Sequence, residues 1–382
     1  MVFISLGKID KNLIPIIVGA FFSMLNKLLI KYKHTKLFKH KIIPNILSIF
    51  SKTLTIIPYI ILKLRTKKNK NKEDKDINNN DIELIYIDMK KEQTQGKVKY
   101  IILSSVLLFI QGILVLYSLE VKSNSWIWDI SATTLLYHFV LKIKLYKHHY
   151  LSIISIILLG FTIDIVFGNL QYDLSNNLLK FFFRFLREIS YSFYDVVNKY
   201  LFEKKFCSVY ELSFFVGLTN IILFGLFSVL NYYYLKIDNF EKYFNNFNIL
   251  ELIISICLII IQLGLSLSCL ITNNNNTPCH IFIIAVLGQF INYMDFSTNS
   301  IIIIVFLLLI LFMTLIFTEI IEINICGLSK NTKRNIAFRA KTEDSSLENN
   351  YTIYSVNTID ENDEIIQKEK TLELNTNRIK EA

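Results

Sequence analysis

The sequence predicts an all-α integral membrane protein of about ten transmembrane helices. Ten long apolar stretches recur between Leu13 and Phe317. The chain is 52% hydrophobic with 30 Phe and 19% charged residues, and its mean hydropathy is +0.41. A soluble domain needs more polar residues to cover its surface. The apolar runs are continuous, which favours helices over barrel strands, because strands of a barrel alternate apolar and polar residues.

The first five apolar stretches predict helices of membrane-spanning length, about 20 residues each. The first follows Lys8, Asp10 and Lys11 and has no small-residue cleavage site after it, so we expect it to be retained rather than cleaved as a signal peptide. The second is interrupted by Pro44 and Pro58. The expected ranges are 11–31, 42–63, 99–120, 125–145 and 149–168.

The second five stretches include the most and the least hydrophobic of the chain. The sixth carries several charges, and the ninth is short. The eighth carries only Glu251, at its edge, and the tenth contains the charge-free run Ile301 to Phe317. The expected ranges are 178–202, 209–235, 250–272, 278–295 and 299–323.

Two polar segments, 64–98 and 340–382, are expected to be disordered and cytoplasmic, because they bury too little apolar area to offset the entropy of ordering. Basic residues remain on the cytoplasmic side of a membrane. Lysine clusters follow the second, fourth, sixth and tenth helices, so the alternation predicts that both termini are cytoplasmic. The basic segment 31–41 falls on the opposite side. Either that loop is functional or the first helix does not span.

The sequence carries no signature of an enzyme. It has no glycine-rich phosphate loop, no HExxH and no GxSxG, and none of its His residues is followed four positions later by Asp as in acyltransferases. The five Cys have no metal-ligand or CxxC spacing, so we expect them to serve packing. No cofactor, metal or nucleic acid is expected; the basic residues flank helices, where they meet anionic lipid.

A short internal repeat relates the two groups of five helices. The end of the first helix, Asn26 to Lys33, matches the end of the sixth, Asn198 to Lys205, at four of eight positions. Because each half has an odd number of crossings, the second half would have the inverted orientation, an architecture found in transporters. The predicted domains are 11–168 and 178–323, each a five-helix repeat.

Several stretches resemble the drug/metabolite transporter superfamily, including its EamA-like and nucleotide-sugar-transporter-like branches. The segment Asp129 to Gly168 is similar to its fourth and fifth helices, with the small and polar start Ser131 to Thr134 and the basic hairpin Leu141 to Leu145. Arg187 to Phe206 resembles its sixth helix and exit, and Thr277 to Phe290 the start of its ninth. The resemblance covers about residues 11–323 and implies transport of a small solute by alternating access.

One difference from that superfamily concerns the substrate. The Asn-rich motifs of nucleotide-sugar carriers lie within helices, whereas the similar string Tyr243 to Asn246 lies here in a polar loop. A nucleotide sugar is therefore not the expected substrate.

The sixth helix carries a stripe of polar residues at three- and four-residue spacing, which places them on one helical face. Glu188 lies four residues after Arg184 and Asp195 four before Lys199, so the opposite charges of each pair are expected to neutralise one another. Lipid does not tolerate such a face, because each central charge costs about 2.5–3.5 kcal/mol. The stripe can line a substrate site, with a cation binding an anion and a carboxylate carrying a coupling proton. It can also be a salt-bridge network between helices, or its ends can reach the two interfaces. The candidate binding residues are Arg184, Glu188, Tyr191, Asp195 and Lys199; Arg187 and Asn198 lie in the same stripe.

Other polar residues at membrane depth are weaker candidates for binding. Asn26 and Lys27 are included because the repeat matches them to Asn198 and Lys199. A lone Gln or His in a membrane bundle more often joins two helices than contacts a ligand, and the pair His148–His149 is expected to contact lipid headgroups. The remaining candidates are Thr133, Tyr137, His138, Gln262 and Gln289.

The sequence thus predicts a membrane transporter of a small polar or anionic metabolite. The alternative is a non-transporting membrane protein on the same scaffold, acting as an interaction or receptor component. The final residues Arg378 to Ala382 loosely resemble a dilysine-type retrieval signal with Arg in place of one Lys, a match that chance also explains. An endomembrane such as the Golgi or the endoplasmic reticulum is the expected location. The substrate, coupling ion and oligomeric state are not indicated.

Overall fold

The computed structural model describes residues 4–6, 11–31, 43–73, 96–118, 126–167, 178–231, 233, 249–294, 297–323 and 332. The chain divides into two compact units. One is Lys8–Ile320, and the other combines Met1–Gly7 with Ile321–Ala382. They are described separately below.

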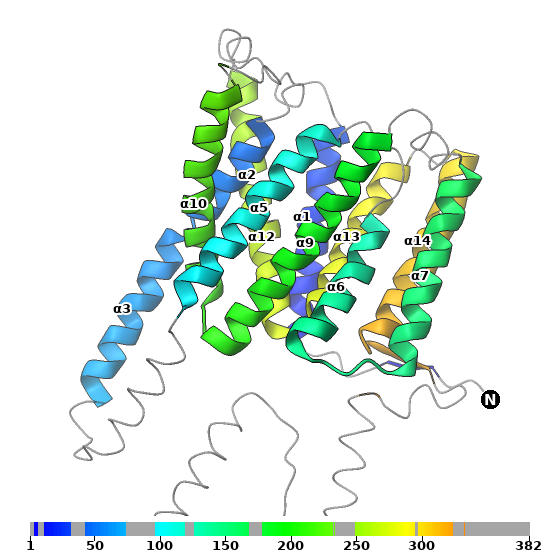
Figure 1. Cartoon of the computed structure of the whole chain (residues 1–382), viewed down its shortest axis with the longest axis horizontal. Coiled ribbons are helices and arrows are strands. Elements are labelled where there is room, and N and C mark those ends of the chain that lie inside the picture. Colours follow the sequence, from blue (N-terminus) through cyan, green and yellow to red (C-terminus); the bar gives the residue numbers. More distant parts are fainter. Residues whose placement is uncertain are drawn as a thin grey trace, which may run out of the picture. The chain divides into compact units, whose positions relative to one another are not determined.

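Helices make up the larger unit (Figure 1), and every one of the ten expected apolar stretches contains helix. Helix α13 is extended at both ends by short 3-10 helices, η4 (Pro278–His280) and η5 (Phe290–Tyr293), and η1 (Lys11–Leu13) precedes α1. The helices are α1 (Ile14–Lys31), α2 (Ile43–Thr53), α3 (Ile56–Glu73), α5 (Lys97–Tyr117), α6 (Trp126–Leu141), α7 (Lys147–Val166), α9 (Leu178–Lys205), α10 (Val209–Leu230), α12 (Ile249–Asn275), α13 (Ile281–Gln289) and α14 (Thr298–Phe317).

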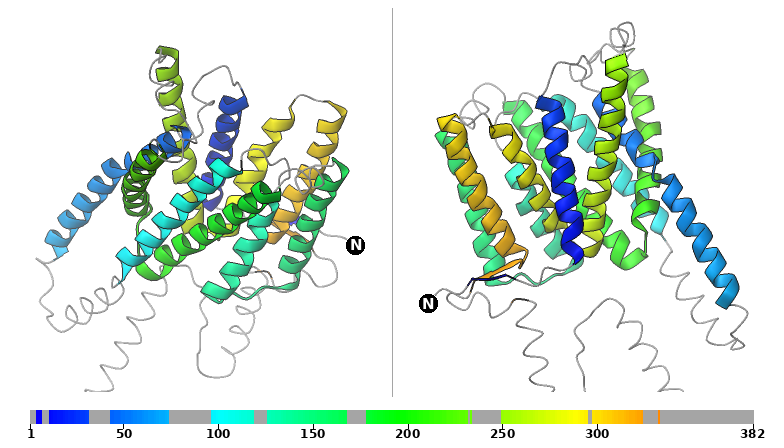
Figure 2. Two further views of the ribbon diagram at one scale, coloured as in Figure 1. Left: turned by 45° about the horizontal axis from the view of Figure 1, so that its top comes forward. Right: turned by 180° about the vertical axis from the view of Figure 1, so that it is seen from behind.

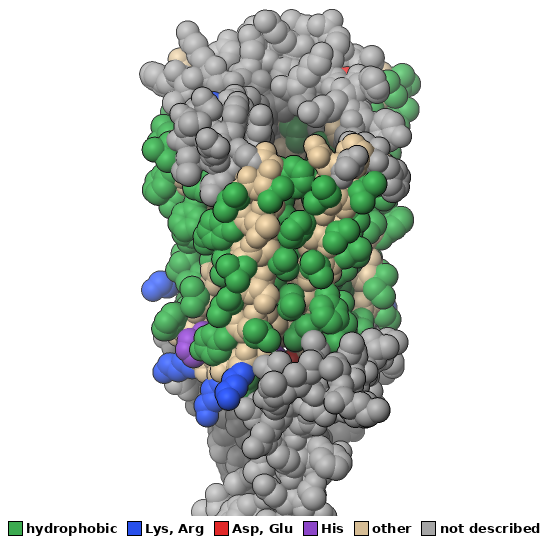
Figure 3. Space-filling view, turned by 90° about the vertical axis from the view of Figure 1, so that its right-hand side faces the viewer, with side chains coloured by type: hydrophobic (Ala, Val, Ile, Leu, Met, Phe, Trp, Pro, Cys, Tyr) green, Lys and Arg blue, Asp and Glu red, His purple; other side chains and the backbone are tan. Residues whose placement is uncertain are grey.

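Six helical segments among the described residues are long and apolar enough to cross a membrane: Ile43–Arg65, Lys97–Tyr117, Lys147–Val166, Val209–Leu230, Ile249–Asn275 and Asn299–Phe317. The face formed by α7 and α14 shows a band of hydrophobic side chains with basic side chains at one end (Figure 3). Leu158 of α7 and Val305 of α14 are more than half exposed. A water-soluble fold buries such residues, whereas lipid covers them. The protein is a multi-pass helical membrane protein.

Packing places α1 and α9 in the middle of the helical unit (Figures 1 and 2). Helix α9 packs on α5, α6 and α12, and α1 packs on α12 and α13. Helix α10 packs on α2, α3 and α5, while α7 packs on α14. One apolar core lies between α5, α9 and α10, and includes Leu201, Leu212 and Val216. A second lies between α6, α7, α13 and α14. The polar face of α9 is therefore enclosed by other helices.

The second expected helix, 42–63, is broken in the structure. Helix α2 ends at Thr53, and α3 begins at Ile56. Pro58 is the cause, because it has no N–H to donate to the carbonyl of Leu54. Helix α3 then continues to Glu73, so the expectation of disorder from residue 64 is wrong for 64–73. The Lys and Glu residues there are good helix formers. Residues 74–95 and 340–382 lie outside the described part, as does most of the basic segment 31–41.

The smaller unit contains an antiparallel strand pair, β1 (Ile4–Leu6) with β2 (Ile321–Ile323), in which Ile4 pairs with Ile323. The sequence predicted helix through residue 323, and this was wrong. Helix α14 ends at Phe317, and Glu319 adopts a left-handed backbone with φ of 60°. A non-glycine residue in that region ends a helix.

Candidate functional site

Helix α9 presents its polar stripe to the interior of the bundle. Glu188, Asp195 and Lys199 are each no more than 5% exposed, and Asn198 is fully buried. The helix is amphipathic along its whole length, so its charged face is covered by α5, α6 and α12 while residues such as Phe182 and Phe193 stay exposed. The stripe thus lies where side chains of other helices can meet it.

A cluster of basic side chains surrounds Glu188. The Nε of Arg184 lies 3.6 Å from the Oε1 of Glu188, and Arg187 pairs with the same carboxylate oxygen. The half-buried Lys27 of α1 is close enough to Arg184 and Arg187 to be repelled by them. The expected pairing of Arg184 with Glu188 is confirmed. Two arginines thus share the Glu188 carboxylate, and Lys27 lies near both of them.

Asp129 of α6 joins the stripe through hydroxyl groups. Ser192 of α9 donates to the Oδ1 of Asp129 at 2.8 Å, and Thr133 donates to the same oxygen at 3.2 Å. Ser192 is fully buried. The Ser192–Asp129 hydrogen bond joins α9 to α6, and Thr133 supports the Asp129 carboxylate from within α6.

A second charged group combines Lys52 of α2 with Asp195 of α9. Lys52 is 8% exposed and its Nζ lies 5.4 Å from the centroid of the Tyr194 ring. The Cys269 thiol and the Asp195 carboxylate are both close enough to act on the Lys52 ammonium. Lys52 was not among the candidates from the sequence. The available signal was an ionisable residue in the middle of an apolar span, which by itself marks a functional hypothesis.

The position of Lys52 depends on a glycine of α10. A Cβ at Gly217 would lie 2.9 Å from the backbone nitrogen of Thr53 and 3.0 Å from the Cβ of Lys52. Only glycine allows this approach of α10 to α2. The Oγ1 of Thr55 donates to the Lys52 carbonyl at 2.7 Å, which fixes the backbone at the end of α2.

Lys199 does not pair with Asp195, contrary to the expected neutralisation of one by the other. Its Nζ donates to the carbonyl oxygen of Asn274 at 3.0 Å and lies 3.1 Å from the Oε1 of Glu203. Both partners are within reach because Glu203 lies one turn further along α9 and α12 ends beside it. Asp195 is thereby left to face Lys52.

Amide and hydroxyl groups connect the helices around these charges. Gln262 of α12 donates to Asn26 of α1 at 2.9 Å and accepts from Ser48 of α2 at 3.2 Å. Ser104 of α5 donates to Asn198 at 2.6 Å, and Asn220 of α10 donates to the carbonyl of the adjacent Ser105 at 3.1 Å. Gln262 and Asn26 therefore bridge helices, as expected for a lone Gln.

The remaining candidates lie at different distances from the stripe. Tyr191 is on it, and its ring centroid is 6.3 Å from that of Tyr194. Tyr137 is buried in α6. His138 contacts the carbonyl of Ile143 in the connection after α6, and Gln289 accepts from Asn292 at 2.7 Å near the end of α13. The structure does not bring His138 or Gln289 to the interior charges.

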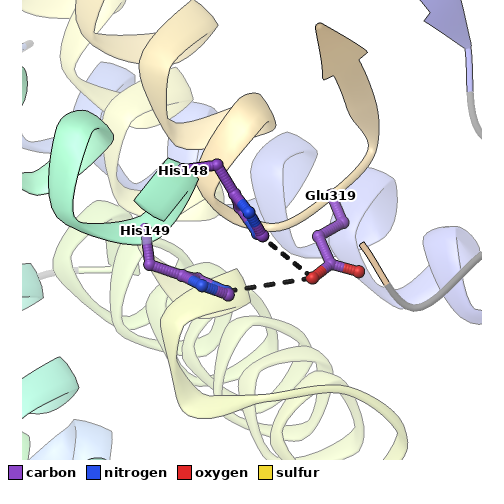
Figure 4. Close-up of side chains that lie close together, drawn as sticks. All are labelled: His148, His149 and Glu319. Atoms are coloured by element: carbon purple, nitrogen blue, oxygen red, sulfur yellow. Dashed lines mark hydrogen bonds and ion pairs between the residues drawn. The ribbon is translucent and has the colours of Figure 1, made fainter. Parts of the chain in front are cut away.

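His148 and His149 converge on Glu319 (Figure 4). The Nε2 atoms of the two rings lie 3.2 Å and 3.9 Å from the Oε1 of Glu319. These donor atoms are within 4.8 Å of one another, close enough for a metal ion. The Nδ1 of His149, however, accepts from the backbone N–H of Tyr146 at 3.1 Å. In the neutral ring its Nε2 then carries the hydrogen and has no lone pair to offer a metal ion. The geometry favours a bridge between α7 and the residues after α14.

The described cysteines have no partner cysteine. Cys207 and Cys279 are buried and Cys257 is exposed; Cys326 lies outside the described residues. Burial raises the pKa of the Cys207 thiol to about 12, with the nearby Glu211 carboxylate adding to the effect. A thiol of that kind is a poor nucleophile and metal ligand.

Comparison with models of known families and with curated proteins gives no match to this chain, so its function is argued from the geometry of the bundle.

Proposed function

We propose that the protein is a carrier that moves a small polar or anionic metabolite across a membrane by alternating access. The observation that carries this proposal is the meeting of buried charges from both halves of the chain at one helix. Lys27, Lys52 and Asp129 come from the first half, and the stripe on α9 comes from the second. Interior charges in a membrane bundle are costly and mark solute or ion pathways.

The proposal includes two inverted halves of five helices, and the packing pattern supports it. In this arrangement the counterparts are α1 and α9, α2 and α10, α5 and α12, α6 and α13, and α7 and α14. Replacing each helix by its counterpart turns the contact of α5 with α9 into that of α12 with α1. The same exchange relates α6–α9 to α1–α13, α2–α12 to α5–α10, and α6–α7 to α13–α14. Each of these contacts is present. The contacts α2–α10 and α7–α14 each join a helix to its own counterpart. A pseudo-two-fold relation has this property.

The hydrogen bonds between helices show the same correspondence between the two halves. Asn26 accepts from α12, and its counterpart in the repeat, Asn198, accepts from α5. The link then continues from α12 to Ser48 of α2 in one case and from α5 to Asn220 of α10 in the other. The short sequence repeat therefore coincides with a repeated pattern of hydrogen bonds, which supports inverted halves that move against each other.

Ten spans are part of the proposal. Helices α1, α6, α9 and α13 are shorter or more polar than the six apolar spans. Helix α9 has 28 residues, about 42 Å at 1.5 Å per residue, so it is long enough to span. Its polar face is acceptable because protein covers it.

The orientation of the protein in the membrane follows from the basic residues near the helix ends. Lys142, Lys144 and Lys147 are exposed in the connection between α6 and α7. By the positive-inside rule this end is cytoplasmic, which with ten spans places both termini in the cytoplasm. An endomembrane is the proposed location.

Reconstitution of the purified protein in liposomes with a panel of metabolites tests the proposal. Arg184→Ala should abolish uptake, because it removes a cation of the interior group, while expression is retained. Lys204→Ala is the matched control, since Lys204 lies on the same helix but is exposed. Absence of uptake or exchange of every solute by a folded preparation would refute the carrier. Unimpaired transport by Arg184→Ala would reduce the stripe to a structural role.

A further inference from the structure

We propose that Lys52 and Asp195 bind the two ends of a small zwitterion, with its anionic group on the Lys52 ammonium and its own ammonium on the Asp195 carboxylate. The binding site stands on the geometry below; that the bound molecule is the transported solute rests on the proposed carrier function.

Both charged groups are buried without an ion pair. Lys52 is 8% exposed and Asp195 4% exposed. Within the described residues, neither side chain has an ion-pair partner within 4.0 Å, and neither charged group makes a hydrogen bond. The Lys52 amine lies over the face of the Tyr194 ring. This is weaker than a salt bridge with a carboxylate.

Such an arrangement leaves two opposite charges near each other but not joined. Asp195 acts on Lys52, yet the pair is separated by more than the 4.0 Å of an ion pair. An uncompensated ion in a low-dielectric interior is costly, and each of these would be stabilised by a partner of opposite sign. The Lys52 amine lies over the ring of Tyr194, the residue next to Asp195, so both groups can be reached by one short molecule that makes a charge-assisted hydrogen bond of about 2.8 Å to each.

A zwitterion matches Lys52 and Asp195 together better than an ion of either sign does. A simple anion on Lys52 would leave Asp195 uncompensated and close to the carboxylate of Asp129, which acts on it. A simple cation on Asp195 would leave Lys52 uncompensated. A molecule with both charges satisfies both groups and leaves the net charge of the site unchanged.

Hydrogen bonds hold the backbone in place at both Lys52 and Asp195. The Lys52 carbonyl accepts from Thr55 at 2.7 Å and from Ser213 at 3.5 Å. The Asp195 carbonyl accepts from the side-chain amide of Asn273 at 2.8 Å. Fixed backbones with open charged ends are the features of a preorganised binding site. By contrast, Glu188 is already paired with Arg184 and Arg187.

Thermal unfolding of the detergent-purified full chain with the standard amino acids, each tested singly, examines binding. We expect at least one to stabilise the protein. The N-acetylated form of that amino acid, which keeps only the negative charge, and its amide, which keeps only the positive charge, should not. No stabilisation by any amino acid, or equal stabilisation by the blocked forms, would overturn the proposal.

Two variants make the assignment residue-specific. Lys52→Met and Asp195→Asn should each weaken zwitterion binding by about ten- to hundredfold, the loss of one charge-assisted hydrogen bond. Lys52→Met should instead be stabilised by the amide, and Asp195→Asn by the N-acetyl form, which an unfolded variant could not show. Lys204→Met is the exposed control. Unchanged zwitterion binding in both variants, or no gain of either blocked form, would contradict the assignment.

Transport measurements separate this proposal from the carrier itself. If an amino acid stabilises the protein but no solute crosses liposomes, the carrier is refuted and the site stands. If only anions are transported and no amino acid binds, the zwitterion is refuted and the carrier stands.

Discussion

Helices α1 and α9 carry the same Asn–Lys pair but differ in charge along the rest of their length. Aligning Asn26 with Asn198 places Ser23 opposite Asp195 and Ile16 opposite Glu188. Both Asn residues accept a hydrogen bond from a neighbouring helix, α12 in one case and α5 in the other. The carboxylates, however, belong to α9 alone.

The difference separates two requirements of the fold. The Asn residues that join helices occur on both α1 and α9, while the carboxylates of Glu188 and Asp195 occur on α9 alone. In the proposed architecture of two halves, shared residues would thus provide the packing and the charged residues of one central helix the chemistry. This comparison can be tested by changing the charges, the cross-half contact and the shared bridges in turn.

The largest loss of stability is expected when the charge on α9 is left unbalanced. Glu188→Ala removes the carboxylate shared by Arg184 and Arg187. We expect a loss of about 3 kcal/mol of unfolding free energy, near the lower end for a broken buried pair, since both Arg side chains are about a fifth exposed. Denaturant unfolding in detergent measures it.

The matched control is Glu203→Ala, also on α9. Its carboxylate is 32% exposed and Lys199 retains the Asn274 carbonyl, so the loss should stay below about 1 kcal/mol. Equal losses of unfolding free energy for Glu188→Ala and Glu203→Ala would show that the charged stripe is enclosed to the same degree along its whole length.

An intermediate effect is expected at the contact between α2 and α10. Gly217→Leu would force α10 away from the backbone of Lys52 and Thr53 and should cost about 1–3 kcal/mol by overpacking. It should also weaken zwitterion binding by displacing Lys52. Gly225→Leu on the same helix is the control, since a Cβ there meets nothing within 4 Å. Identical unfolding and binding by the two variants would rule out a role of this contact.

The smallest effect is expected at the shared bridges. Ser104→Ala leaves the Oδ1 of Asn198 without its donor and should cost about 1 kcal/mol. The adjacent Ser105→Ala should cost less, because the Ser105 hydroxyl donates to Ile101 of its own helix. Gln262→Leu, in the bridge of the other half, should resemble Ser104→Ala. A large difference between Ser104→Ala and Gln262→Leu would break the equivalence of the two bridges.

The sequence was sufficient for features that depend on neighbours along one helix. The apolar stretches predicted the helices, and the spacing of Arg184 and Glu188 predicted their ion pair. Glu203 was a possible partner of Lys199 by the same spacing as Asp195. The choice between them depends on the end of α12, which spacing along α9 does not reveal.

Features made by distant segments were not predicted. Lys52 has no charged neighbour one turn away in its own helix, and its relation to Asp195 arises only when α2 packs against α10 and α12 in the bundle. The contact of His148 with Glu319 joins residues that are 171 positions apart. The break after α2 was within reach of sequence reasoning, because a proline affects the helix four residues before it.

The strand pair has a consequence for the order of events during synthesis. Ile4 pairs with Ile323, so the first of these residues leaves the ribosome long before its partner exists. The two strands can meet only after every helix between them has been made, since their pairing closes a loop of more than three hundred residues, from Ile4 to Ile323. A spectroscopic or crosslinking probe across Ile4 and Ile323 would therefore report the end of folding, after insertion of the helices is complete.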